Sequence, residues 1–286
     1  MAMQRQTGPA ASWTRRARSI FKQYVMPAEH GGWFLWIGPF LLGTFAADRF
    51  SGDIVVLLLL IVSGFLARQP LVILVKSMAG RRAQDDILPA SKVFAVLALF
   101  VAVFLAILLA HGHWYLIWLA LPAVPVLAVQ MWLVARRQER QIAIELFGAG
   151  VLALAATAAY WVSLGSSDIV GWLLWALAWL YNASAIVYVY LRLQQRRWSA
   201  VPEWRDRLRA GRRTLIYAGV NLAVSLVLSL LGFVSPVVPL AFAFAVIHFG
   251  WGIAFPAVRA RPTRVGIEQS IATVAFFLIL AIAFRV

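Results

Sequence analysis

One basic residue, Arg68, lies inside an apolar stretch of the sequence, and this position indicates a binding role. An ionisable side chain at membrane depth is costly and commonly faces a bundle interior or a charged ligand. Lys76 lies about 12 Å further along a helix that rises ~1.5 Å per residue, and Gln69 shares a helical face with Lys76. Alternatively, Arg68 extends its charged end to the membrane surface. Arginine and lysine bind phosphate or carboxylate directly. We therefore expect Arg68 and Lys76, with the neighbouring Gln69, to contact an anionic headgroup.

Further polar residues fall near the same end of the predicted helices. The remaining candidates for binding an anion are Arg136, Arg137, Asn182, Tyr188 and Arg192. Glu29, His30 and Glu145 are candidates for acid or base chemistry. Their shared depth predicts a polar cavity that opens to the cytoplasm. Each also has a structural explanation, since Glu145 could pair with a basic residue of the preceding loop and Tyr188 could belong to an interfacial aromatic belt.

Metal and nucleotide chemistry have little support. The chain has no cysteine, which excludes thiolate metal sites and cysteine nucleophiles. Mg²⁺ requires several oxygen ligands, yet Asp85 and Asp86 are the one adjacent carboxylate pair and follow two arginines. His111 and His113 form a His-x-His pair without nearby carboxylates in the sequence. We therefore predict no cofactor and no metal site, and we leave the roles of His111, His113 and His248 open.

The elements that must position these residues are apolar segments of membrane-crossing length. A spanning helix needs about 20 mostly apolar residues. Nine segments fit: 31–47, 54–75, 93–110, 114–135, 142–164, 169–191, 215–234, 237–257 and 265–284. Most of the 26 Lys and Arg residues fall in every second gap between them. Since basic loops stay in the cytoplasm, we predict an all-α, polytopic transmembrane bundle of about nine spans with a cytoplasmic N-terminus and an external C-terminus.

Composition agrees with a membrane protein. The chain is 63% hydrophobic and 13% charged, with a formal net charge of +15. The short basic loops predict contact with membrane lipids, mainly anionic inner-leaflet headgroups, and no nucleic acid, since no separate polar domain is present. We expect a cytoplasmic amphipathic segment over 1–26 and a single transmembrane domain over 27–286. The polar stretch 192–213 indicates an interfacial helix or an ordered cytoplasmic cap.

A family resemblance is carried by the entry to the first apolar segment. The run Pro27-Ala28-Glu29-His30-Gly31-Gly32-Trp33, followed by Gly38-Pro39-Phe40-Leu41-Leu42-Gly43, resembles the opening motif of the YwiC-like bacterial membrane proteins. Arg68-Gln69-Pro70, and Glu145 with Gly148, also fit that family. Gly32 replaces its usual alanine. The resemblance implies a multi-pass protein of the bacterial cytoplasmic membrane and supplies no activity.

A more distant resemblance concerns topology. The expected spans and large cytoplasmic loops are similar to those of UbiA-type intramembrane prenyltransferases, as is Trp132-x-x-x-Arg136-Arg137 before a glycine-containing span. Those enzymes hold Mg²⁺ on aspartate-rich motifs, but the corresponding stretches here contain no aspartate. We therefore expect binding of an anionic amphiphile, a lipid or an isoprenoid phosphate-like molecule, and leave open whether the protein is a divergent transferase. The alternatives are a small-anion transporter or permease, and a non-catalytic membrane scaffold or assembly protein.

Overall fold

The structure is a computed structural model that describes residues 21–26, 30–47, 49–137 and 142–285. Within these residues the chain is helical and contains no strand. The α-helices are α2 (Phe34–Ala46), α3 (Asp53–Met78), α4 (Ile87–Ala110), α5 (Ile117–Ala135), α6 (Ile142–Leu164), α7 (Ile169–Gln195), α8 (Trp204–Leu230), α9 (Val238–Ala254) and α10 (Pro262–Ala283). Short helical turns are η1 (Phe21–Val25), η2 (His30–Trp33), η3 (Gln84–Asp86) and η4 (Trp114–Leu116).

The lengths of the helices confirm an all-α, multi-pass membrane protein. In the described part of the chain, 7 helices are long and apolar enough to cross a membrane. Two further apolar helices, α2 and α9, have 13 and 17 residues. The prediction of about nine spans is therefore approximate, because these two fall short of the usual length of about 20 residues.

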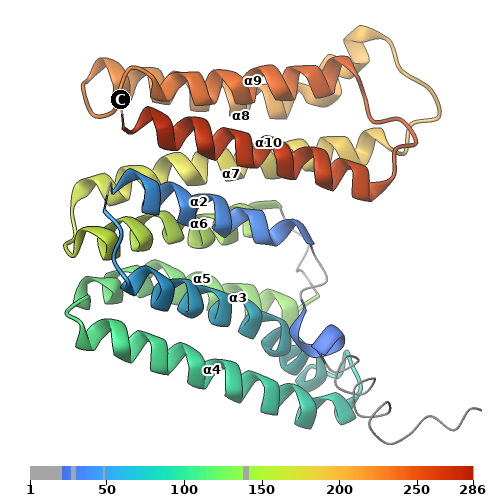
Figure 1. Cartoon of the computed structure of the whole chain (residues 1–286). Helices are drawn as coiled ribbons and strands as arrows, with labels where there is room; N and C mark the ends of the chain where they lie inside the picture. Colours follow the sequence, from blue (N-terminus) through green and yellow to red (C-terminus); the bar gives the residue numbers. More distant parts are fainter. Residues whose placement is uncertain (1–20, 27–29, 48, 138–141, 286) are drawn as a thin grey trace, which may run out of the picture.

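The helices lie side by side in a bundle, with α2 and α6 near its middle (Figure 1). On one side of this central pair lie α3, α4 and α5, and on the other lie α7, α8, α9 and α10. The main core cluster runs through both sides and is built largely from alanine, leucine and aromatic side chains. The arrangement matters for function because the central pair separates polar residues of α3 and α5 from those of α9 and α10.

Small residues bring α2 close to its neighbours. A side chain at Gly43 would meet the backbone of Ala156 and Tyr160 in α6, and one at Gly38 would meet the ring of Phe277 in α10. Such close approach is the usual role of glycine in packed membrane helices. Pro39 is buried between the two glycines.

The long basic stretch differs from its prediction. Residues 204–213 do not form a helix of their own, because they are the first turns of α8, which continues to Leu230. The alternative of an ordered cytoplasmic cap stays a prediction. Pro202 precedes the helix, and the residues that follow are mostly arginine, leucine and alanine, which favour helix. Arg192 itself lies in α7, which extends to Gln195.

The N-terminal segment is described only from Phe21 onward. Of the predicted amphipathic segment 1–26, residues 1–20 therefore lie outside the described residues. Tyr24 is buried against Ile73 and Ala90, and its hydroxyl donates a hydrogen bond to Asp86. That hydrogen bond, together with burial, raises the pKa of the Tyr24 phenol above its ordinary value of 10.0. Tyr24 thus attaches η1 to α3 and α4 as a protonated phenol.

Candidate functional site

Arg192 is the centre of a polar network at the end of α7. Its side chain is buried, and its Nη1 atom donates to the carbonyl oxygens of Gly252 at 3.0 Å and Phe255 at 2.9 Å. These carbonyls lie at the C-terminal end of α9, where backbone acceptors lack helical partners and a cation is favoured. Arg192 therefore caps α9 from a neighbouring helix.

Two more side chains complete this cap. The Nη2 atom of Arg192 donates to Glu268 Oε2 in α10 at 3.2 Å, and Nη1 also contacts Gln195 Oε1 at 3.1 Å. Gln195 in turn donates to the Gly252 carbonyl at 3.1 Å. Because α7, α9 and α10 all contribute, the Arg192 network joins three helices at one end of the bundle. The proposed headgroup role of Arg192 stays a prediction. The contacts described here give Arg192 a structural role.

An aromatic wall lies next to the Arg192 network. The ring of Tyr188 is 4.6 Å from that of Phe249 and 5.2 Å from that of His248, between centroids. A side chain on Gly252 would overlap the Tyr188 hydroxyl, so glycine at this position makes room for the tyrosine. Nearby, His248 Nε2 and Gln269 Oε1 are buried atoms that make no hydrogen bond of normal length with any of the described residues. Unpaired atoms of this kind are unusual in a packed interior.

Polar contacts continue across the bundle from α10 to α2. The Tyr181 hydroxyl lies 3.1 Å from Thr273 Oγ1, and Gln269 Nε2 lies 3.3 Å from the same oxygen. Asn182 is fully buried and donates from Nδ2 to the Leu35 carbonyl at 2.9 Å. Asn182, predicted to bind a ligand, therefore also holds α7 to α2.

The remaining predicted cations lie on the surface of the bundle. Arg68, Arg136 and Arg137 are exposed, while Gln69 and Lys76 are partly buried. The guanidinium of Arg136 lies 4.2 Å from the centre of the Trp132 ring. In a membrane, exposed cations on α3 and just after α5 face lipid or headgroups rather than the protein interior.

The acid and base candidates are only partly described. The side chains of Glu29 and His30 lie outside the described residues. Glu145 accepts a hydrogen bond of 2.6 Å from the Tyr190 hydroxyl, which links α6 to α7. Among the residues that the structure describes, no group of three or more His, Asp or Glu side chains is arranged to hold a metal ion.

The predicted binding residues thus form two groups instead of one. Arg68 and Lys76 belong to α3 and Arg136 directly follows α5, whereas Tyr188 and Arg192 belong to α7. In Figure 1, α2 and α6 separate α3 and α5 from α9 and α10, the partners of Arg192. The sequence predicted that these residues lie at a similar depth in the membrane. It did not predict the order of the helices around the bundle.

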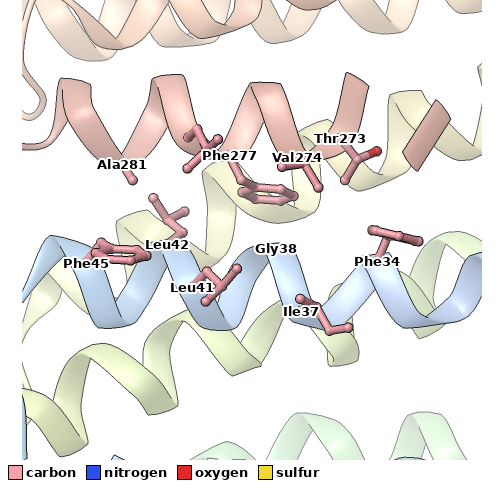
Figure 2. Close-up of a pocket in the computed structure, with 11 residues that line it drawn as sticks. Phe34, Ile37, Gly38, Leu41, Leu42, Phe45, Thr273, Val274, Phe277 and Ala281 are labelled. Carbon is pink, nitrogen blue, oxygen red and sulfur yellow. The ribbon is translucent and has the colours of Figure 1, made fainter. Parts of the chain in front are cut away.

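An apolar groove between α2 and α10 was not predicted. Figure 2 shows side chains of both helices facing one another across it. Its lining comprises Phe34, Ile37, Gly38, Leu41, Leu42 and Phe45 of α2, with Thr273, Val274, Phe277, Leu278 and Ala281 of α10. The cavity is small, about 40 Å³, and Thr273 supplies its one hydroxyl. No sequence motif predicts this groove, because the groove depends on which two helices become neighbours.

A second unpredicted cluster lies at the opposite end of the bundle from the Arg192 network. His111 Nδ1 and His113 Nε2 contact the two carboxylate oxygens of Asp53, at 2.7 Å and 2.8 Å. Asp53 begins α3, while the histidines follow α4. The His-x-His spacing was visible in the sequence. The carboxylate partner, Asp53, could not be recognised from the sequence because it lies 60 residues away from His113.

Comparison with known proteins identifies part of the chain. Residues 26–160, from the end of η1 into α6, match the family described as YwiC-like protein. The resemblance predicted from the opening motif is therefore confirmed. No curated protein and no solved structure matches the chain, so the UbiA-type arrangement stays a prediction.

Proposed function

We propose that this membrane protein, YwiC-like over residues 26–160, binds an anionic amphiphile whose hydrocarbon chain lies in the groove between α2 and α10. A lipid and an isoprenoid phosphate share the chemistry that this site would recognise. The groove is the observation that supports the proposal, because its lining is apolar apart from the Thr273 hydroxyl (Figure 2). The proposal concerns binding alone, since the contacts of the described residues do not identify an acid or a base for a reaction.

The small size of the groove, about 40 Å³, favours a thin hydrocarbon chain. Leu278 and Leu41 line it and are 51% and 40% exposed, so the groove is reached from the membrane side. Moving a hydrocarbon chain from lipid into such a groove gains little hydrophobic free energy, because lipid tails are equally apolar. Selection must therefore come from close packing and from the headgroup.

Cations near the start of α10 provide contacts for a headgroup. Arg261 and Arg264 are exposed, and they precede the groove residue Thr273 along the helix. Arg264 is held by Glu268 Oε1 at 2.8 Å from its Nε atom, which leaves its other guanidinium nitrogens for a phosphate or carboxylate. A charge-assisted contact of this kind is about twice as strong as a neutral hydrogen bond.

The tail site is tested by filling the groove. We expect native mass spectrometry of the purified protein to detect a retained anionic lipid or isoprenoid phosphate, and a Leu278→Trp variant to lose most of it. Ile247→Trp is the matched control, because Ile247 is also exposed on its helix but does not line the groove. Equal retention by the two variants would contradict the tail site.

The headgroup site is tested separately with two variants, each of which removes one candidate contact. Arg264→Gln should reduce retention if the headgroup lies at α10. Arg68→Leu tests the contact predicted from sequence on α3, with the exposed Arg205 changed to leucine as the control. Retention unchanged by both Arg264→Gln and Arg68→Leu would show that neither cation binds the ligand.

A further inference from the structure

The first turns of α8 carry basic side chains with two different roles. Residues 204–213 contain five arginines and one aspartate. Arg207 faces the protein, where its Nη1 atom donates to the Ala254 carbonyl at the end of α9 at 2.7 Å. The other four arginines are exposed, namely Arg205, Arg209, Arg212 and Arg213. One arginine therefore holds α8 to α9, and four face away from the protein.

Close packing against α9 fixes this orientation of α8. Gly211 is buried, and a side chain at this position would collide with an isoleucine of α9. Thr214 and Ala218 are also buried and share the helical face of Gly211, because they follow it by three and seven positions. Arg212 and Ile216 lie on the other side of the helix and are exposed. The small residues of the buried face thus decide which side chains point outward.

A hollow on the outward side of α8 is lined by cations and by apolar side chains. This α8 hollow has a volume of about 590 Å³, and its lining is Leu208, Arg209, Arg212, Leu215 and Ile216. Arg209 and Arg212 are three positions apart, so their side chains are neighbours on the helix surface. Within the described part of the chain, neither arginine forms an ion pair. The two cations are therefore open to an anion from outside the protein.

The α8 hollow lies where the helix changes from basic to apolar. Leu215 and Ile216 belong to the uncharged part of α8, which runs to Leu230. Arg212 precedes Leu215 by about 4.5 Å along the axis, at ~1.5 Å rise per residue. Ile216 is 50% exposed beside the cations. A soluble anion or an acidic peptide would pair with the arginines but would leave this apolar surface uncovered. A phospholipid supplies a phosphate and a hydrocarbon chain in one molecule, so it fits both parts.

We infer that the α8 hollow binds an anionic phospholipid, with the phosphate between Arg209 and Arg212 and the acyl chains along Leu215 and Ile216. The inference does not rest on the groove between α2 and α10, which other helices form. Arginine binds phosphate through charge-assisted, bidentate contacts. A zwitterionic lipid has the same phosphate but no net charge, so it lacks the attraction between basic residues and an anionic membrane surface. The site should therefore prefer an anionic lipid.

The inference is tested by titrating the delipidated full-length protein in detergent with phosphatidylglycerol and with phosphatidylcholine of equal chain length. Native mass spectrometry measures how much of each lipid is bound. We expect the wild type to bind phosphatidylglycerol more tightly than phosphatidylcholine. Replacing both arginines, Arg209→Gln together with Arg212→Gln, should weaken the binding of phosphatidylglycerol roughly 30-fold, the combined effect of two basic residues near a membrane surface. Equal binding of the two lipids to the wild type would overturn the inference.

The matched control removes the same charge from the same helix. Arg205→Gln together with Arg213→Gln replaces two exposed arginines of α8 that do not line the hollow. This double variant should keep most of the wild-type affinity for phosphatidylglycerol. An equal loss in the two double variants would show that the general charge of α8, and not the hollow, attracts the lipid.

Two further measurements separate the α8 hollow from the groove and from a site for free anions. The titration is repeated in Leu278→Trp, which fills the groove between α2 and α10, and the preference for phosphatidylglycerol should persist. Loss of the preference in this variant would assign the bound lipid to the groove. Inorganic phosphate has no acyl chain, so an excess of it should not displace phosphatidylglycerol. Displacement by phosphate would show that the hollow recognises only an anion.

Discussion

At the scale of single residues, the buried Arg192 and the exposed Arg68 show how one side-chain type serves different purposes. Arg192 is surrounded by protein acceptors, namely two α9 carbonyls and Glu268. Arg68 lies on the outer surface of α3. The sequence marked both as cations near one membrane face. It could not distinguish them, because burial depends on which neighbours pack against a helix face.

Replacing Arg192 should destabilise the fold. In Arg192→Leu the Phe255 carbonyl loses its Arg192 donor, and a buried polar group without a partner costs about 1–3 kcal/mol. We expect a loss of roughly 2–3 kcal/mol in the free energy of unfolding, measured in one detergent. The exposed Arg197, changed to leucine, should alter stability by less than about 0.5 kcal/mol. Equal stability of the two variants would rule out the capping role.

At the scale of elements, the contact between α2 and α6 determines the centre of the bundle. α2 has only 13 residues, so its position depends on packing more than on intrinsic helix stability. Gly43 permits the backbones of α2 and α6 to meet at Ala156. The same placement of α2 presents its other face to α10 and so creates the groove.

Adding one methyl group at this contact should move α2. In Gly43→Ala the new Cβ would collide with the α6 backbone, and overpacking of this kind costs about 1–3 kcal/mol. Gly219→Ala is the control, because no atom of the described residues lies within 4 Å of the added atom and alanine favours helix by up to ~1 kcal/mol. The unfolding temperature of Gly43→Ala should therefore be lower than that of the wild type. The unfolding temperature of Gly219→Ala should be the same as that of the wild type or higher. The opposite order would show that α2 and α6 are not closely packed.

At the scale of the whole molecule, basic and weakly charged loops alternate along the bundle. The loop that precedes α8 is rich in arginine, whereas the loop between α6 and α7 has none. Positively charged loops resist translocation during insertion. The orientation with basic loops in the cytoplasm follows from this charge pattern and stays a prediction.

Cysteine labelling tests the orientation directly, because the chain has no cysteine of its own. Ser166 and Ser199 are exposed in the loops before α7 and α8. We expect a membrane-impermeant maleimide to label Ser166→Cys in intact cells and Ser199→Cys only after permeabilisation. The reverse result would place the basic loops outside.

The sequence by itself determined the helices and their class. Runs of apolar residues indicate membrane helices because backbone groups in lipid must bond within each helix, and segment 142–164 agrees with α6 at both ends. The opening motif also identified the YwiC-like resemblance. These features are local, so a single stretch of chain contains all the information they require.

Only the tertiary structure decided which polar residues meet. Arg192 reaches Glu268 across 76 positions, and His113 reaches Asp53 across 60. Helix periodicity predicts the face on which a residue lies, but the identity of the facing helix depends on packing of the whole bundle. For that reason the two-sided arrangement of cations, the groove at α2 and α10, and the contact of His113 with Asp53 emerge from the fold alone.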